Sequence, residues 1–465
     1  MKRKFRFQFI FLIITGNLNA AILNVPGNYS TIQAAINASV NGDTIVVSPG
    51  TYFENINLRG KNILLTSLYY VANDTAYISS TIINGSSPVY PDTASCVIYN
   101  SGEDTTSILQ GFTLTGGTGT KWNDVHGAGL YREGGGILIE LSSPKIIHNI
   151  IKYNSATNIS GVLSAGGGGI RIGDGNPVIC SNAILYNQGR YGAGIVLNYT
   201  GCQMTNNIIA SNTGGQDYFG GSGIWIYGNL GTTPKLIINN SIINNYSSLS
   251  STSGTGGISA WLATNVIIKN NILWGNLPST QIRTSASIPL VSYSDIQNGY
   301  TGTGNINTNP LFANQNYLLD SISPCIDAGD TANIYNDLDD MGNPGHALFP
   351  SNGLLSNDMG AYGGPCAALL PFFQSSTAMP EAINTSQKIR IFPNPFSTST
   401  TLQTEHFLKN AILTIYTQQG QIIAQIENIS GNTITINRSN LPEGVYFIQL
   451  VSGDSIYTDK VVITE

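Results

Sequence analysis

Aromatic, basic and acidic side chains gather in the segments that separate short apolar runs in the middle of the chain. Such side chains suit a sugar, since aromatic rings pack on its apolar faces and charged groups bond its hydroxyls. A carbohydrate-binding groove is one hypothesis, and a solvated face with scattered aromatic residues is the alternative. The candidate ligand-binding residues are Lys121, Trp122, Asp124, Arg171, Asp174, Arg190, Tyr191, Asp217, Tyr218 and Trp225.

Catalysis by these residues is a second hypothesis. Arg171, Asp174 and Asp217 could together supply an acid–base centre. No catalytic motif is recognisable around them, so the sequence assigns no catalytic residue and leaves open whether the protein is an enzyme.

A repeat must position these residues. Five Gly-Ile pairs each begin a short apolar run, at spacings of 25 to 34 residues, and each run is followed by two asparagines five residues apart. The runs are too short for helices and are bounded by Gly, Asn, Ser or Pro. Self-similarity of this kind predicts a solenoid of stacked strands, a right-handed parallel β-helix in an all-β protein. The Gly-Ile pairs start at Gly136, Gly169, Gly194, Gly223 and Gly257.

The repeated asparagines are expected at the corners of the coils, where they tolerate left-handed backbone and can bond from one coil to the next. Strand alternation predicts which side chains face solvent. With the first isoleucine of each run inward, the outward column is Leu138, Arg171, Val196, Trp225 and Ser259. The segments between coils all leave at one corner, and the short one from Gln188 to Ala193 could leave a groove between longer neighbours.

Composition agrees with a solenoid. Charged residues make up 10% of the 465 residues, and there are 52 glycines. Hydrophobic content of 41% argues against a disordered chain.

The amino terminus predicts export. Lys2, Arg3, Lys4 and Arg6 precede an apolar run from Phe7 to Ile14, which is typical of a signal peptide cleaved after Ala20 or Ala21. The run is too short to span a bilayer, and no later segment is long enough. Losing four basic and no acidic residues moves the net charge from −6 to about −10, which argues against a nucleic-acid partner.

Residues 24–66 predict an entry cap and a first coil. A short amphipathic helix is expected at Tyr29–Ile36, followed by the strand and turn of Gly42–Tyr52. With Glu54-Asn55 these motifs resemble the amino-terminal cap of the pectin-lyase-like superfamily. The resemblance implies the fold, not an activity. For an enzyme it implies a polysaccharide lyase, glycoside hydrolase or carbohydrate esterase.

Residues 301–370 do not follow the sequence pattern of the repeats. Ser323-Pro324-Cys325-Ile326-Asp327 and Asp358-Met359-Gly360-Ala361-Tyr362 resemble the closing segment of bacterial β-helix repeat proteins. Asp337, Asp339 and Asp340 could offer oxygen ligands to calcium, the one cofactor suggested. No complete EF-hand spacing is present, and the alternative is that these aspartates bond turn amides.

Five cysteines give no Cys-x-x-Cys pair, which argues against a zinc site. Cys325 and Cys366 are the disulfide candidate, since both lie in the closing segment of an exported protein. Each cysteine could equally be a small buried apolar residue.

The carboxyl-terminal part alternates short apolar strands, which predicts a small Ig-like β-sandwich of six or seven strands. Phe392-Pro393-Asn394-Pro395-Phe396 and Leu441-Pro442-Glu443-Gly444-Val445-Tyr446-Phe447 resemble the type A sorting domain of the type IX secretion system of Bacteroidota. The resemblance implies that the secretion machinery is a partner and that the protein reaches the cell surface or the medium.

The predicted domains are a signal peptide at 1–20, a β-helix at 21–300, its closing segment at 301–370, a linker at 371–387 and the sorting domain at 388–465. We expect an exported protein that binds a polysaccharide or is adhesive. The alternatives are an enzyme acting on uronate-containing glycans and a structural rod without a ligand.

Overall fold

The computed structural model describes residues 20–218, 220–250, 252–367, 390–417, 422–439, 441–452 and 455–464. These residues form two compact units, one on each side of residues 368–389. The predicted linker and all of the predicted signal peptide except Ala20 lie outside the described residues.

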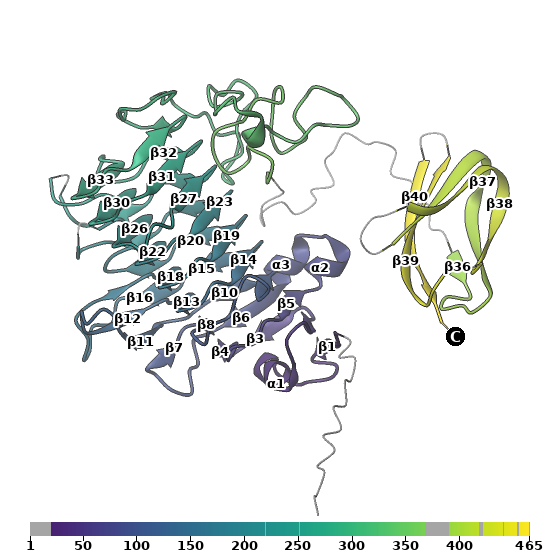
Figure 1. Ribbon diagram of the computed structural model, residues 1–465, viewed down its shortest axis with the longest axis horizontal. Helices are drawn as coiled ribbons and strands as arrows, with labels where there is room; N and C mark the ends of the chain where they lie inside the picture. Colours follow the sequence, from purple (N-terminus) through teal and green to yellow (C-terminus); the bar gives the residue numbers. More distant parts are fainter. Residues whose placement is uncertain are drawn as a thin grey trace, which may run out of the picture. The chain divides into compact units, whose positions relative to one another are not determined.

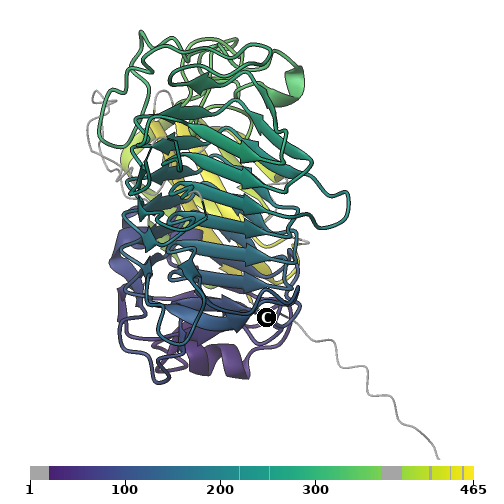
Figure 2. The same cartoon turned by 90° about the vertical axis from the view of Figure 1, so that its left-hand side faces the viewer.

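Three long parallel sheets surround one core in the first unit, with equivalent strands stacked as successive rungs (Figures 1 and 2). In spatial order, sheet A contains β1 (Ile22–Val25), β2 (Thr44–Val47), β5 (Leu64–Ser67), β9 (Ile108–Gln110), β14 (Lys145–Ile147), β19 (Val178–Cys180), β23 (Gln203–Thr205), β27 (Lys235–Ile238), β31 (Val266–Lys269) and β34 (Leu290–Ser292). Sheet B contains β3 (Gly50–Tyr52), β6 (Thr81–Asn84), β10 (Thr113–Thr115), β15 (Ile150–Lys152), β20 (Ala183–Leu185), β24 (Ile208–Ala210), β28 (Ser241–Ile243), β32 (Ile272–Trp274) and β35 (Asp295–Ile296). Sheet C contains β4 (Ile56–Asn57), β8 (Val97–Tyr99), β13 (Ile137–Glu140), β18 (Ile170–Gly173), β22 (Ile195–Asn198), β26 (Ile224–Tyr227), β30 (Ile258–Trp261) and β33 (Ile282–Ser285).

Two short sheets and three α-helices complete the coils. Sheet D, which has antiparallel pairs, contains β7 (Thr93–Ala94), β11 (Gly119–Asn123), β12 (Leu130–Glu133) and β17 (Ala165–Gly166). Sheet E is parallel and contains β16 (Ser155–Ala156), β21 (Gln188–Gly189), β25 (Thr213–Gly214) and β29 (Tyr246–Ser247). The helices are α1 (Ile32–Ala38), α2 (Tyr69–Ala72) and α3 (Ala76–Ser80).

The repeat has the register that the sequence predicts. Ile170 pairs with Ile137 on one side and Ile195 on the other, and the alignment continues through Ile224 to Ile258. All five isoleucines are fully buried in the continuous core. One coil alone could not bury this apolar surface, so stacking stabilises the fold. The parallel β-helix is thereby confirmed.

Two columns of buried asparagines form amide ladders between coils, as predicted. In each ladder, the side-chain Nδ2 of one asparagine donates to Oδ1 of the next at 2.9–3.1 Å. The left-handed backbone lies one residue earlier than expected, at residues such as Ser181 (φ 53°) before Asn182 and Tyr186 (φ 54°) before Asn187. These preceding residues turn the corner, which leaves each asparagine free to point inward.

The amino-terminal cap is the predicted helix. The Thr31 hydroxyl accepts a hydrogen bond from the Ala34 amide, and Ile32, Ala35 and Ile36 are buried. The Glu54 carboxylate accepts bonds from the amides of Ile32 and Gln33, both at 2.9 Å. It therefore neutralises the positive end of α1.

The closing segment packs along the outer face of sheet B, and it contains the 3-10 helix η1 (Asn333–Tyr335). The side-chain amide of Asn206 donates to the Ala361 carbonyl (3.1 Å), and that of Asn239 to the Asp358 carbonyl (2.8 Å). The apolar contacts join Leu319, Cys325, Met359, Ala361 and Tyr362 to Ala183, Leu185, Ile208, Ala210, Ile243 and Ile272. The closing segment thus covers one side of the β-helix and also follows its last coil.

The second unit is an antiparallel β-domain with its own core. Its described residues form five strands where six or seven were expected, because residues 422–437 form one long strand instead of separate short ones. The strands are β36 (Arg390–Phe392), β37 (Ser399–Tyr416), β38 (Ile422–Asn437), β39 (Gly444–Ser452) and β40 (Ser455–Ile463). Irregularities in the pairing of β37 with β38 let these long strands bend around the core.

Across the residues that the structure describes, no helix is long and apolar enough to cross a membrane.

Candidate functional site

The outward column of sheet C is buried, which corrects the prediction that it faces solvent. Leu138, Arg171, Val196 and Ser259 are at most 1% exposed, and Trp225 is 7% exposed. The corner segments cause this burial, because their side chains fold over the strands; Tyr191, for example, packs on Val196 and Trp225. Instead of an open face, the structure has a cleft beside the side chains that cover sheet C.

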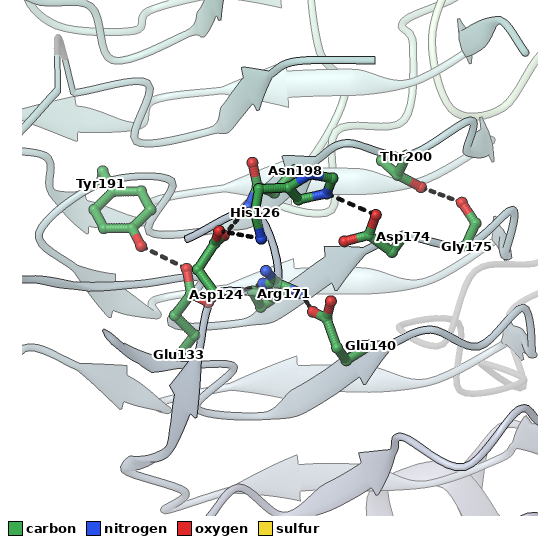
Figure 3. A network of polar contacts seen from close by, with 10 residues as sticks. All are labelled: Asp124, His126, Glu133, Glu140, Arg171, Asp174, Gly175, Tyr191, Asn198 and Thr200. Carbon is green, nitrogen blue, oxygen red and sulfur yellow. Dashed lines mark hydrogen bonds and ion pairs between the residues drawn. The ribbon is translucent and has the colours of Figure 1, made fainter. Parts of the chain in front are cut away.

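Arg171, Glu133 and Glu140 form a buried charged cluster under the covered part of sheet C, which we call the floor (Figure 3). The Nε atom of Arg171 lies 2.9 Å from a carboxylate oxygen of Glu133, and its NH1 contacts the carboxylate of Glu140. The Tyr191 hydroxyl donates to the other oxygen of Glu133 at 2.5 Å. Two buried carboxylates therefore share one guanidinium, an arrangement that is stable only when every partner is present.

Beside this floor lies a cleft of about 330 Å³. It lies against the later coils of sheet C and is walled by the turn of residues 124–131. Its lining residues are Asp124, His126, Gly127, Ala128, Tyr131, Glu133, Tyr191, Asn198, Tyr199, Tyr218, Trp225, Tyr227 and Trp261.

Aromatic rings form most of the cleft wall. The rings of Trp225 and Tyr227 are stacked, with centroids 5.6 Å apart and planes at 6°. Trp261 stands at 88° to Tyr227, with centroids 5.9 Å apart. Trp225 is fixed by its indole Nε1, which donates to the Tyr218 carbonyl at 3.0 Å. The rings thus form preorganised apolar surfaces at right angles to one another.

Polar groups also lie around the cleft (Figure 3). His126 Nε2 is 2.8 Å from Asp174 Oδ1, and the imidazole stacks on Tyr199 with centroids 3.6 Å apart. Asp174 occupies a corner residue after β18, with φ 49°, which turns its carboxylate toward His126. Asp124 accepts bonds from the His126 amide (2.8 Å) and from Asn198 Nδ2 (3.2 Å).

Two acceptors, one in the cleft lining and one behind His126, have no hydrogen-bond partner among the described residues. They are Oδ1 of Asn198 and Oδ2 of Asp174, and both atoms are buried. A buried acceptor without a partner costs roughly 1–3 kcal/mol. A ligand with hydroxyl or amino groups would satisfy such atoms.

The hydroxyls of Tyr131, Tyr191 and Tyr199 keep their protons. The pKa of Tyr191 is raised mainly by burial, and further by the charge of Glu133. Burial also raises the pKa of Tyr131 and Tyr199, with smaller contributions from neighbouring tyrosines and then carboxylates. The phenols are therefore neutral hydrogen-bonding groups in a region of negative potential.

Five of the ten predicted ligand-binding residues lie at the cleft or beneath it: Asp124, Arg171, Tyr191, Tyr218 and Trp225. A sixth, Asp174, does not line the cleft but contacts His126, which does. The other four are not among the cleft-lining residues. Lys121 pairs with Asp92 at 3.1 Å, and Trp122 lies beside it on β11. Arg190 makes a two-pronged pair with Asp217, at 2.8 and 3.0 Å.

Sequence reasoning did not place Asn198, Tyr227 and Trp261 among the candidates. They are paired neighbours at the last position of successive strands of sheet C. Each lies four residues after the glycine of its Gly-Ile pair, so the repeat register contained the signal. Tyr199 follows Asn198 at a corner with φ 47° and was also missed.

The three aspartates proposed for calcium do not converge. Asp337 is buried and accepts bonds from the amides of Asp358 and Gly364. Asp339 and Asp340 accept turn amides, from Gly345 at 2.9 Å and Gly342 at 2.8 Å. These bonds agree with the alternative interpretation, in which the aspartates accept hydrogen bonds from turn amides. The described residues contain no group of three or more His, Cys, Asp or Glu side chains that could hold a metal.

The predicted Cys325–Cys366 disulfide is not formed, because all five cysteines are free thiols. Cys325 is buried, and its Sγ lies 3.3 Å from Oδ2 of Asp295, whereas Cys366 is exposed. Burial raises the pKa of the Cys96 thiol to about 12, which suits a packing role.

Comparison with known proteins identifies the second unit. Residues 390–464 match the family model described as the secretion system C-terminal sorting domain. No curated protein matches the chain. A solved pectin methylesterase mutant in complex with a hexasaccharide is similar at 9% identity and a TM-score of 0.28, covering 66% of this chain and 98% of its own. The sorting domain means that the protein is exported through the type IX system to the cell surface or the extracellular space.

Proposed function

We propose that the exported β-helix binds a carbohydrate chain in the aromatic cleft on sheet C. The observation that supports this most strongly is the set of fixed aromatic faces that line one cleft together with hydrogen-bonding carboxylates and an amide. Sugar rings offer both apolar faces and hydroxyl groups, so one ligand class can use both kinds of side chain.

The cleft is prepared for a ligand before binding. Trp225 is held by a hydrogen bond and by ring contacts, and His126 is held between Tyr199 and Asp174. Rigid side chains lose little entropy on binding, which raises affinity for a given contact area.

An enzyme acting on uronates has less support. A uronate carboxylate needs a cation to balance it, and none of the described residues that line the cleft is Lys or Arg. Arg171 lies beneath the cleft and is occupied by Glu133 and Glu140. A structural rod without a ligand would not require the unpartnered acceptors beside the cleft.

A glycan array probed with the full-length protein tests this proposal. Tyr227→Ala and Trp261→Ala each remove one ring from the cleft wall and should lower binding about tenfold, since a stacked ring contributes roughly 0.5–1.5 kcal/mol. Tyr186→Ala is the matched control, because Tyr186 is exposed and stacks on Tyr153 at the edge of sheet B.

Binding that is unchanged in both cleft variants would move the site elsewhere. Absence of binding to any glycan would favour the rod.

A further inference from the structure

The charges around the cleft do not balance. Four carboxylates, those of Asp124, Glu133, Glu140 and Asp174, face one guanidinium and one imidazole. Arg171 balances only part of the Glu133 and Glu140 charge. Because charges close together in a poorly hydrated cleft act strongly on one another, the potential inside is negative.

Among the described residues, Asp124 makes no ion pair with a cation, unlike Asp174, Glu133 and Glu140. The hydrogen bonds that Asp124 accepts come from the backbone amides of His126 and Ala128 and from Asn198 Nδ2. Asp174 uses only Oδ1 for His126, and its Oδ2 is unpartnered. Together with Oδ1 of Asn198, this gives two unpartnered acceptors beside the cleft among the described residues.

The aromatic wall also favours a cation. Tyr227 meets Tyr199 at 81° and Trp261 at 88°, so ring faces enclose the cleft from different directions. The face of an aromatic ring attracts an ammonium group within about 6 Å of its centre. The rings and the carboxylates thus both favour a ligand with a positive charge.

We propose that the cleft selects glycans that carry a free amine, such as chains of β-linked glucosamine. The ammonium group supplies three donors and one positive charge to a cleft in which none of the described lining residues is Lys or Arg. Acetylation removes the charge and most of the donors, and a uronate would bring a further negative charge. This inference rests on the proposed carbohydrate-binding function.

The test is calorimetric titration of the full-length protein at pH 6 with three hexasaccharides: glucosamine, N-acetylglucosamine and galacturonic acid. We expect the glucosamine hexamer to bind at least tenfold more tightly than its acetylated form, and 0.5 M NaCl to reduce this preference. We expect the galacturonate hexamer to bind most weakly.

Asp174→Asn keeps the shape of the side chain and removes one charge. It should reduce the preference for the amine about tenfold and change the affinity for the acetylated hexamer less than threefold. Asp217→Asn is the matched control, since Asp217 pairs with Arg190 and is not among the cleft-lining residues.

Equal or tighter binding of the acetylated or galacturonate hexamer would overturn the amine inference and leave the proposed function standing. If none of the three hexamers binds, the inference also fails. The glycan array then decides separately whether the protein binds carbohydrate at all.

Discussion

The outer faces of sheets B and C are both covered, but by different chemistry. Sheet B presents small and aliphatic side chains, such as Ala183 and Ile208, and the closing segment packs on them with Met359 and Tyr362. On sheet C, corner segments place carboxylates and aromatic rings over the buried Arg171. The first cover is an apolar interface, whereas the second leaves an aromatic cleft.

This difference suggests that the cover of sheet B serves packing, whereas the cover of sheet C also serves binding. Apolar contacts are non-directional and stabilise the closed face of sheet B. The network on sheet C keeps unpartnered oxygens at Asp174 and Asn198, which lower stability unless a ligand is present. We therefore expect substitutions on sheet B to affect stability alone and those at the sheet C cleft to affect binding as well.

The largest effect is expected for Arg171→Met. It leaves Glu133 and Glu140 buried without their shared guanidinium, which should lower the free energy of unfolding by about 3–5 kcal/mol. Chemical denaturation measures the change. Adding Glu140→Gln to the same chain should recover part of the loss, and no recovery would contradict the role given to this carboxylate pair.

Met359→Ala tests the face of sheet B. The side chain is 1% exposed within the cover, so its truncation should cost about 2–5 kcal/mol by leaving a cavity. Glycan affinity should stay unchanged in the folded variant. A selective loss of binding, with stability unaltered, would contradict the separation of the two faces.

The closing segment should also weaken as the pH rises. Burial, and then the charge of Asp358, raises the pKa of Asp337 to about 8, and burial raises that of Asp358 to about 7. The folded state binds these protons more tightly than the unfolded chain, where an aspartate has a pKa of about 3.9. Stability should therefore fall between pH 5 and 9, by at most about 1.4 kcal/mol per pH unit for each group.

Thermal unfolding at pH 5, 7 and 9 measures this slope. Asp337→Asn should flatten it, because the amide keeps an acceptor for the Gly364 amide without titrating. The exposed Asp339 provides the control variant, Asp339→Asn. A slope that Asp337→Asn does not change would assign the pH dependence to other groups.

The smallest effect is expected for Tyr186→Ala. Its ring is 47% exposed and stacks on Tyr153, so the free energy of unfolding should change by less than about 0.5 kcal/mol. A loss above 1 kcal/mol in denaturation would mean that the exposed edge of sheet B contributes to the core.

The sequence was sufficient for the parts of the fold that repeat. Ile170 and Asn182 recur in equivalent positions, and a period fixes both their register and their burial. The covers do not repeat, so the burial of Arg171 and the pairing of Asp337 with Asp358 depend on long-range contacts that no spacing shows. Four of the thirteen residues that line the cleft were among the predicted candidates, while Tyr227 and Trp261 required attention to the last strand position.

The most direct test of the two-face account is hydrogen exchange of the full-length protein with and without the glucosamine hexamer. Ligand binding should slow exchange in residues 124–131 and 191–199, which form the cleft wall, and leave residues 357–367 on sheet B unchanged. Bound hexamer with no protection at the cleft, or with protection confined to the closing segment, would contradict the account.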